Sequence, residues 1–214
     1  DIGSNIGYYV LLENMKIGKN GKIWAIEPSP ENFSTLKENI ELQNGENIKA
    51  FNFAIGDKNG EIEFVISKKS NWSKVKSENE SVDSENKVIN VPLKTLDSFA
   101  KENNLERVNL LRMDVEGYEN KIILGATQFL NQFKPTIMLE IHKMIMGEKE
   151  TRKILEKFKE TNYENQYFVP RIYDSQIIGN ENDIKQVSID DLLEKLENNV
   201  LPDTFQMTLK PIKK

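Results

Sequence analysis

Apolar and polar residues follow two different periods that replace one another along the chain. Short apolar runs such as residues 22–27 and 108–114 have the length and composition of buried strands. By contrast, Phe33, Leu36 and Ile40 recur at the spacing of one helix face. This exchange of strand and helix predicts an α/β fold, in which helices cover both faces of a mostly parallel sheet.

The same pattern assigns the other elements. Ser29 and Pro30 mark the start of one helix, because serine caps helix N-termini and proline suits the first helical position. Residues 68–87 are rich in Lys, Ser, Asn and Glu around the single aromatic Trp72, and we expect a mobile loop there. No internal repeat is visible, so residues 1–214 are expected to form a single domain. The expected strands are 22–27, 48–55, 61–66, 88–93, 108–114, 136–142, one near Tyr167, and 205–209; the expected helices are 5–15, 30–43, one capped by Thr95, one through 122–124, 151–161 and 189–196.

The most specific signal is the glycine-rich opening, Asp1-Ile2-Gly3-Ser4-Asn5-Ile6-Gly7. Gly3 and Gly7 would let the backbone turn tightly and approach a ligand closely. The helix that begins beside them offers free N–H groups and a positive dipole end. Asp1 would lie at the carboxyl end of a preceding strand, where open α/β sheets bind ligands. Glu27 ends the next strand and can accept hydrogen bonds from both hydroxyls of a ribose.

Two cofactor classes fit a glycine turn flanked by acids. In the dinucleotide fingerprint G-x-G-x-x-G the second glycine falls where this chain has Asn5, and the turn holds a pyrophosphate that Asp1 would repel. Acids after two successive strands suit an adenosyl amino acid better, because they attract its ammonium group and its ribose hydroxyls. The sequence therefore favours S-adenosylmethionine, against the alternative of an ordinary turn beside a surface acid.

Composition removes several other classes. The net charge of −5 disfavours a general nucleic-acid binder, because phosphate neutralisation needs a basic surface. Cysteine is absent and His142 is the only histidine, which excludes thiolate catalysis and zinc sites rich in Cys or His. No apolar run approaches the roughly 20 residues of a membrane span. We expect a cytoplasmic protein, and because the chain opens at Asp1 inside a motif, we expect it to be N-terminally incomplete.

A second polar cluster is expected at the ends of two later strands. Asp114 and Glu116 are two residues apart, as are Glu140 and His142, and residues at this spacing share one face of a strand. If the two strands are parallel neighbours, all four groups gather at the carboxyl edge of the sheet. Arg112, in the first of these strands, is expected to form an ion pair, with Glu140 as one candidate partner.

S-adenosylmethionine donates a methyl group, and its transfer needs an acceptor atom held in line with the sulfonium methyl and a route for the acceptor's proton. His142 is a candidate base, because its reference pKa of about 6.5 lies near neutral pH. Asp114 or Glu116 could take the proton instead, and Glu140 and His142 could both be structural. A divalent metal held by oxygen ligands and His142 is a further, less favoured alternative, because the sequence has no dedicated metal motif.

These motifs together resemble the FkbM-like family of S-adenosylmethionine-dependent O-methyltransferases. The resemblance covers about the first two-thirds of the chain, with its motifs in the family's order. The matching stretches are Asp1 to Tyr9, Ile26-Glu27-Pro28-Ser29-Pro30, Ala54-Ile55-Gly56-Asp57, Leu93-Lys94-Thr95-Leu96-Asp97, Met113-Asp114-Val115-Glu116-Gly117-Tyr118-Glu119 and Leu139-Glu140-Ile141-His142.

The resemblance implies a Rossmann-like three-layer sandwich with a seven-stranded, mostly parallel sheet and an antiparallel last strand. The strand that would precede Asp1 is missing from the chain, which would leave a gap between the strands that end at Glu27 and Asp114. The resemblance also implies cofactor contacts. Asp1, Gly3, Asn5 and Gly7 would line the methionine and ribose, Glu27 would bind the ribose hydroxyls, Pro28 and Ser29 would lie near the adenine, and Asp57 would accept from the adenine amino group.

The expected function is methylation of a hydroxyl on a small molecule, such as a sugar or glycan-linked acceptor. Two rivals remain. An oxidoreductase that binds NAD or a nucleotide sugar would need a pyrophosphate site, and a non-catalytic binding domain would keep the fold without turnover. The sequence does not indicate the oligomeric state.

Overall fold

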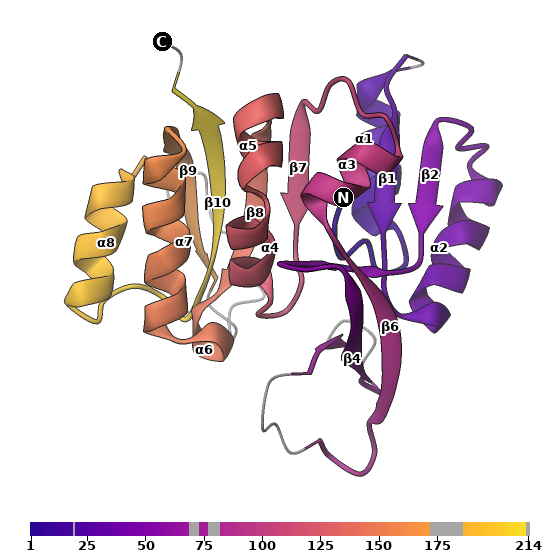
Figure 1. Cartoon of the computed structure of the whole chain (residues 1–214), viewed down its shortest axis with the longest axis horizontal. Helices are drawn as coiled ribbons and strands as arrows, with labels where there is room; N and C mark the ends of the chain where they lie inside the picture. The colour runs from indigo at the N-terminus through magenta and orange to yellow at the C-terminus, as the bar shows by residue number, and fades with distance from the viewer. Residues whose placement is uncertain (19, 69–72, 77–81, 172–185, 213–214) are drawn as a thin grey trace. The chain divides into compact units, whose positions relative to one another are not determined.

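The computed structural model describes all residues except 19, 69–72, 77–81, 172–185 and 213–214. The chain divides into two compact units, Asp1–Thr95 and Leu96–Lys214, and each is described by itself. Figure 1 labels their helices and strands. Trp72 lies outside the described residues.

Unit 1 begins with a small helix-covered pair of strands. β1 (Ile23–Ile26) and β2 (Ile48–Phe51) are parallel, and α1 (Tyr8–Ile17) and α2 (Pro30–Leu42) pack on them. Leu36 is fully buried between the helices and strands, with Phe33 and Ile40 packed beside it, as the apolar spacing predicted. Ser29 caps α2 by accepting from the backbone N–H of Asn32, and Pro30 holds the first helical position. The prediction for this helix is confirmed.

A second sheet completes unit 1. Its strand order is β3-β6-β4-β5, in which β3 and β6 are parallel and the other pairs are antiparallel. The bounds are β3 (Ala54–Gly56), β4 (Gly60–Ile66), β5 (Lys74–Val75) and β6 (Lys87–Thr95). The expected single strand over 48–55 is wrong, because it is split between β2 and β3, which belong to different sheets. Asn52 lies at the break and donates to the carbonyls of Glu27 and Pro28. The described part of 68–87 contains β5.

Unit 2 contains a mixed four-stranded sheet in the order β7-β8-β10-β9. β7 and β8 are parallel, whereas β10 is antiparallel to both β8 and β9, so the expected antiparallel last strand is confirmed. The bounds are β7 (Leu110–Met113), β8 (Thr136–His142), β9 (Tyr163–Arg171) and β10 (Thr204–Pro211). The pairing of β7 with β8 brings two strands that end in acids side by side.

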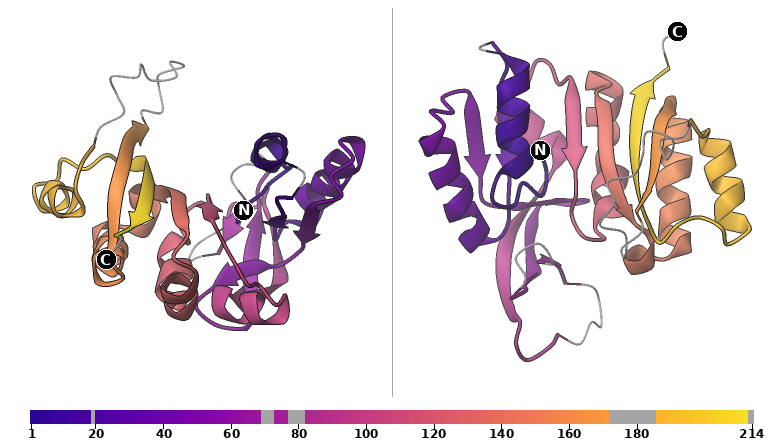
Figure 2. Two further views of the ribbon diagram at one scale, coloured as in Figure 1. Left: turned by 90° about the horizontal axis from the view of Figure 1, so that it is seen from above. Right: turned by 180° about the vertical axis from the view of Figure 1, so that it is seen from behind.

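Helices cover this sheet and supply much of its core. α7 packs against α4, α8 and β9, and the views of Figure 2 show α7 and α8 as neighbouring helices. Ile154, Leu155 and Phe158 on α7 are fully buried. The bounds are α3 (Leu96–Glu102), α4 (Glu119–Gly125), α5 (Thr127–Phe133), α6 (Lys143–Met146), α7 (Glu148–Glu160) and α8 (Ile189–Glu197).

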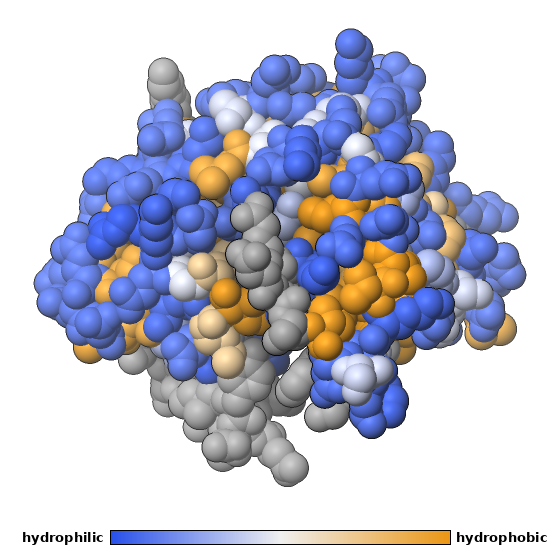
Figure 3. Space-filling model, turned by 60° about the horizontal axis from the view of Figure 1, so that its bottom comes forward, coloured by the Kyte–Doolittle hydropathy of each residue, from blue (hydrophilic) through white to orange (hydrophobic). Residues whose placement is uncertain are grey.

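The fold is therefore mixed α/β, as predicted, and the seven-stranded sheet with a strand missing before Asp1 stays a prediction. The described residues form three hydrogen-bonded sheets. On the side away from β2, β1 meets only a single parallel bridge, between Ile2 and Ile26. Polar side chains predominate on the face drawn in Figure 3, as expected of a chain with 29% charged residues. Among the described residues, no helix combines the length and the apolar character needed to cross a membrane.

Candidate active site

The glycine-rich opening folds into a turn that is anchored on the end of β1. The backbone N–H groups of Gly3 and Ser4 both donate to the carbonyl of Ile26, at 3.0 and 3.1 Å. Gly3, Asn5 and Gly7 all have positive φ, a region that glycine enters without cost and asparagine more readily than most residues. Sequence and backbone therefore agree that this segment makes a tight turn into α1.

Gly7 is required for a second reason. A Cβ atom added there would lie 2.7 Å from Cδ1 of Leu36, which is buried on α2. The turn therefore approaches α2 more closely than any side chain at position 7 would permit.

Glu27 links this turn to the start of α2. One carboxylate oxygen accepts from the backbone N–H of Asn5 and the other from that of Ser29, both at 2.8 Å. The side chain is almost entirely buried. Burial raises the pKa of Glu27 to about 7, against the opposing pull of the hydrogen bonds from Ser29, Asn5 and the Asn32 side chain. The carboxylate thus stands at the carboxyl end of β1, as predicted.

The other expected cofactor residues of unit 1 surround this point to different degrees. Asp1 runs beside β1, since its carbonyl accepts from Ile26 N–H and its amino group donates to the carbonyl of Trp24. Pro28 and Ser29 follow Glu27 directly, and the Ser29 hydroxyl serves as the cap of α2. Asp57 is exposed and follows β3 directly. β3 belongs to the sheet β3-β6-β4-β5, whereas Glu27 follows β1, which pairs with β2.

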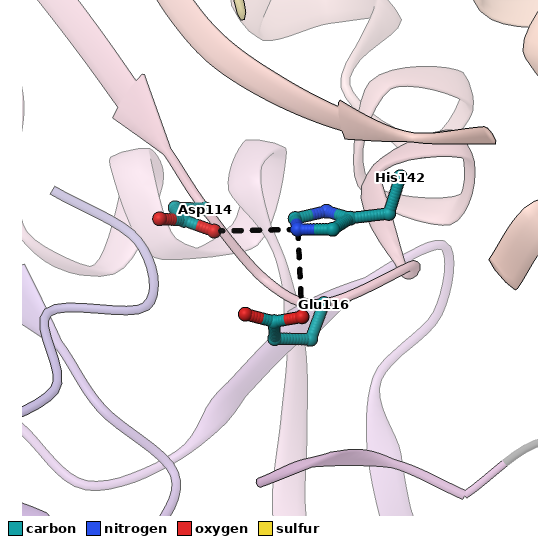
Figure 4. A group of neighbouring side chains, drawn as sticks. All are labelled: Asp114, Glu116 and His142. Atoms are coloured by element: carbon teal, nitrogen blue, oxygen red, sulfur yellow. Dashed lines mark ion pairs between the residues drawn. The ribbon is translucent and has the colours of Figure 1, made fainter. Parts of the chain in front are cut away.

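Unit 2 gathers the four acidic and imidazole groups that the strand spacing predicted. His142, at the end of β8, is 1% exposed. Its Nε2 lies 3.4 Å from Glu116 Oε2, 3.8 Å from Glu140 Oε1 and 4.0 Å from Asp114 Oδ1. Figure 4 shows Asp114 and Glu116, from the segment after β7, with their carboxylates directed at this nitrogen. The expected cluster is confirmed as a geometric fact.

Glu119 is a fifth member of this cluster, to which the sequence analysis assigned no role. Its Oε1 lies 2.7 Å from His142 Nδ1 and accepts from the backbone N–H of Gly117 at 3.1 Å. The Glu119 side chain is fully buried in the first turn of α4. Its place in the Asp114–Glu119 motif was a usable signal, but strand spacing could not show that α4 turns this residue back toward β8.

The backbone between the two acids and Glu119 is unusual. Glu116 and Gly117 both have positive φ, and a Cβ added at Gly117 would lie 2.4 Å from Cγ2 of Ile145. Glu116 and Gly117 therefore form a tight turn between β7 and α4. This turn lets Asp114, Glu116 and Glu119 all approach one imidazole ring.

Glu140 is held from the neighbouring strands. Its Oε2 accepts from Arg171 on β9 at 2.8 Å and from Gln206 on β10 at 3.0 Å. Arg112 is paired with Asp114, with 3.6 Å between Nη2 and Oδ2. Arg112 and Arg171 thus offset part of the negative charge of the cluster. No pattern in the sequence had indicated that Arg171 and Gln206 would contact Glu140.

Mutual proximity shifts the proton affinities of these groups. Burial raises the pKa of Glu116 to about 7, although the charge of His142 opposes this rise. Burial likewise raises the pKa of Asp114, assisted by the charge of Glu140. Burial alone would lower the pKa of His142, but the hydrogen bond and charge of Glu119 and the charges of Glu116 and Glu140 outweigh it and raise this pKa to about 9. The imidazole is therefore protonated near neutral pH and is not a ready proton acceptor in this state.

Asp97 lies in the first turn of α3, and its Oδ1 accepts from the backbone N–H of Phe129 in α5 at 2.7 Å. This bond lies in unit 2 and ties α3 to α5. The expected cofactor residues thus all belong to unit 1, and the acid–histidine cluster belongs to unit 2.

The chain is similar in sequence to known methyltransferases. A curated relative, "Methyltransferase 1" of Beauveria bassiana, is 31% identical over 141 residues, or 58% of this chain and 56% of its own. The "Hexuronic acid methyltransferase AglP" of Haloferax volcanii is 26% identical over 163 residues, or 74% of this chain and 61% of its own. The chain thus spans somewhat more than half the length of these relatives.

A crystal structure titled methyltransferase FkbM, from Methylobacillus flagellatus, is 19% identical and covers 65% of this chain and 31% of its own, with a TM-score of 0.47. The family described as the methyltransferase FkbM domain matches residues 1–165, which contain both the glycine turn and the acid–histidine cluster. The chain therefore belongs to the FkbM methyltransferase domain family.

Proposed function

We propose that this protein uses S-adenosylmethionine to methylate a hydroxyl group of a small molecule, with a sugar or glycan-linked hydroxyl as the acceptor. One observation carries the proposal beyond family membership. The buried Glu27 carboxylate stands at the carboxyl end of β1 and contacts the glycine turn through the N–H of Asn5. An acid in this place matches a ribose, and the turn beside it matches a ligand that approaches the backbone closely.

The cofactor residues belong to unit 1. Asp1, Gly3, Asn5 and Gly7 are assigned to the methionine and ribose portions. Glu27 is assigned to the ribose hydroxyls, because a carboxylate has about four acceptor positions and the backbone N–H groups of Asn5 and Ser29 and the Asn32 side chain do not use all of them.

The adenine is assigned to the segments that follow β1 and β3. Pro28 and Ser29 lie at the first of these, and Asp57 at the second. The Ser29 hydroxyl already caps α2, so this residue would contact the adenine through its backbone or its Cβ.

The acceptor residues belong to unit 2. Methyl transfer to oxygen requires that the hydroxyl be positioned and that its proton be accepted. Asp114 and Glu116 are assigned to this task, since their carboxylates are partly accessible, whereas His142 and Glu140 are buried. His142 is already protonated in this environment, so its role is to orient the two carboxylates, and Glu140 supports it from the other side.

The acceptor class rests on a relative. The Haloferax volcanii protein is named a hexuronic acid methyltransferase, which places a sugar acid among the first acceptors to try. A hydroxyl of such a sugar suits carboxylates that polarise it by hydrogen bonding.

The test is transfer of a labelled methyl group from S-adenosylmethionine to a panel of hydroxylated acceptors that includes hexuronic acids. We expect a labelled product, together with S-adenosylhomocysteine, from the wild-type chain and from Glu61→Gln, which removes an exposed acid of β4. Glu27→Gln should weaken cofactor binding by about 10- to 100-fold, and Asp114→Asn should lose turnover while it still binds cofactor. Turnover that survives both substitutions would refute the assignment of these residues.

Titration calorimetry separates the rivals. S-adenosylhomocysteine should bind and NAD should not, because a pyrophosphate would face Asp1. Binding of NAD without S-adenosylhomocysteine would favour the oxidoreductase. Binding of S-adenosylhomocysteine without turnover on any acceptor would favour a non-catalytic domain.

A further inference from the structure

We propose that Asp114, Glu116 and His142 form a binding site for a divalent transition-metal cation, of which Mn²⁺ and Zn²⁺ are the best matches. The site lies within unit 2, and its three ligand atoms all lie within 4.8 Å of one another. A catalytic use of the cation rests on the proposed function, whereas the binding of the cation to these three residues is independent of that function.

The spacing of the ligand atoms is close to that of a coordination shell. Bonds of about 2.0–2.2 Å place neighbouring ligand atoms of one ion about 3–3.5 Å apart. Glu116 Oε2 is already 3.4 Å from His142 Nε2, and Asp114 Oδ1 is 4.0 Å away. A small rotation of Asp114 would complete a three-ligand site, and its side chain is accessible enough to make that movement.

The state of the histidine is an independent observation that points to a ligand. His142 is 1% exposed, and its Nδ1 is held by the fully buried Glu119 at 2.7 Å. Among the described residues, Nε2 has ion-pair contacts of 3.4–4.0 Å but no hydrogen bond, and it points at the two carboxylates (Figure 4). Histidines that bind metals usually donate their other ring N–H to a carboxylate in this way, which fixes the ring orientation and directs the second nitrogen at the ion. In the metal-free chain that nitrogen carries a proton near neutral pH, and a cation bound there would displace it.

The charges around the ring also favour a cation. Asp114, Glu116, Glu119 and Glu140 all lie within 4.0 Å of the imidazole nitrogens. Arg171 neutralises Glu140 at 2.8 Å, but Arg112 is 3.6 Å from Asp114. A divalent ion between Asp114, Glu116 and His142 would neutralise the remaining negative charge of the carboxylates at a shorter distance than either arginine does.

The donor set selects the class of ion. One imidazole nitrogen with two carboxylates suits Mn²⁺ or Zn²⁺, whereas Ca²⁺ and Mg²⁺ prefer shells of oxygen alone. Three protein ligands leave positions open for water or for the acceptor hydroxyl. A hydroxyl bound there would be more acidic, which is the property that the proposed reaction needs.

The experiment uses the full chain after removal of metal with a chelator. Calorimetric titration with MnCl₂ and, separately, with ZnCl₂ should show one site per chain. Pulsed electron paramagnetic resonance of the Mn²⁺ form should show coupling to an imidazole nitrogen. Glu116→Gln should weaken binding at least about tenfold, and Glu119→Gln about 10- to 100-fold through the histidine it orients. Glu197→Gln on α8 removes one exposed acid of the same unit and should bind as the wild type does.

His142→Gln should abolish the nitrogen coupling, with circular dichroism to verify its fold. Glu116 is partly exposed, so its variant keeps the test decisive if the buried variants do not fold. Wild-type binding no tighter than that of Glu116→Gln, or a Mn²⁺ spectrum without nitrogen coupling, would overturn the proposal. Binding of S-adenosylhomocysteine to the same samples reports on the proposed function separately, so failure of one is distinguishable from failure of the other.

Discussion

Glu27 is a carboxyl group on which burial and hydrogen bonding act in opposite directions. Burial outweighs the bonds from Asn5 and Ser29, and its pKa rises from 4.5 to about 7. The folded chain therefore holds a proton on Glu27 over a pH range in which the unfolded chain has released it.

The first prediction concerns this proton. The stabilising contribution of protonated Glu27 is complete below about pH 4.5 and lost as the pH rises through about 7, which amounts to about 3 kcal/mol. Urea unfolding of the wild type and of Glu27→Gln at several pH values measures it. The difference in unfolding free energy between the two should shift against the wild type as the pH rises, and a constant difference would contradict the raised pKa.

The second prediction concerns the cofactor. Glu27→Gln should weaken S-adenosylhomocysteine binding by about 10- to 100-fold, because a hydrogen bond to a charged group contributes about 1.5–3 kcal/mol. Titration calorimetry gives the affinity, and Glu61→Gln is the control with the same loss of charge. Equal affinities in both variants would show that Glu27 only braces the glycine turn.

At the level of single residues, the sequence predicted those members of the acid–histidine cluster whose positions follow from the spacing of residues along a strand. Glu140 and His142 were paired correctly because both lie in β8, where alternate residues share a face. The same reason is wrong for Asp114 and Glu116, because β7 ends at Met113 and the turn at Glu116 and Gly117 brings these two acids to the histidine. Glu119 and Arg171 were missed because they reach the cluster from a helix and from a later strand. No local period encodes such contacts.

The helices and strands of unit 1 depend on a close approach between α1 and α2. Gly7 has φ +94° at the start of α1, and the space that a Cβ would need is taken by Leu36 of α2. Gly18, at the other end of α1, also has positive φ, but nothing lies within 4 Å of its Cβ position. The two glycines also differ in ψ, which is 12° at Gly7 and 177° at Gly18, so removal of the Leu36 side chain is needed to isolate the crowding at Gly7.

The third prediction uses this pair. Gly18→Ala should lower the unfolding free energy by about 1–3 kcal/mol, because alanine rarely adopts this backbone conformation. Gly7→Ala should lower it by about 2 kcal/mol or more, because strain and overlap add. Urea unfolding measures both. In a Leu36→Ala background the cost of Gly7→Ala should fall to about 1 kcal/mol, the cost of the strain alone, since the overlapping methyl is gone. An unchanged cost in that background would exclude the overlap.

The start of a helix could be predicted where the sequence has a residue type that caps helices, as at Ser29. The division of residues 48–55 into β2 and β3 could not be predicted. Both strands are short and apolar, and the turn between them is set by hydrogen bonds from Asn52 to Glu27 and Pro28, residues far away in the sequence. Periodicity shows that a segment is extended but not which sheet it joins.

At the scale of the whole chain, the alternation of strand and helix predicted the fold class, and the family motifs predicted the family. The periodicity did not show that β3 pairs with β6 and not with β2, because pairing between strands far apart in sequence leaves no periodic signal. The net charge of the whole chain follows directly from the sequence, and it affects whether the chain can bind a nucleic acid.

The last prediction follows from that charge. With 34 acidic against 29 basic residues, the chain has a net charge of −5 and lacks the excess of cations that releases counterions from a phosphate backbone. Fluorescence anisotropy should therefore show binding to a DNA duplex or a structured RNA no tighter than about 100 μM at physiological salt. The same sample should bind S-adenosylhomocysteine, which proves that it is folded. Tight binding to either nucleic acid, with affinity falling steeply as salt is added, would reveal a basic groove and move the acceptor from a sugar hydroxyl to a nucleotide. Binding too weak to measure would agree with the small hydroxylated acceptor that we propose.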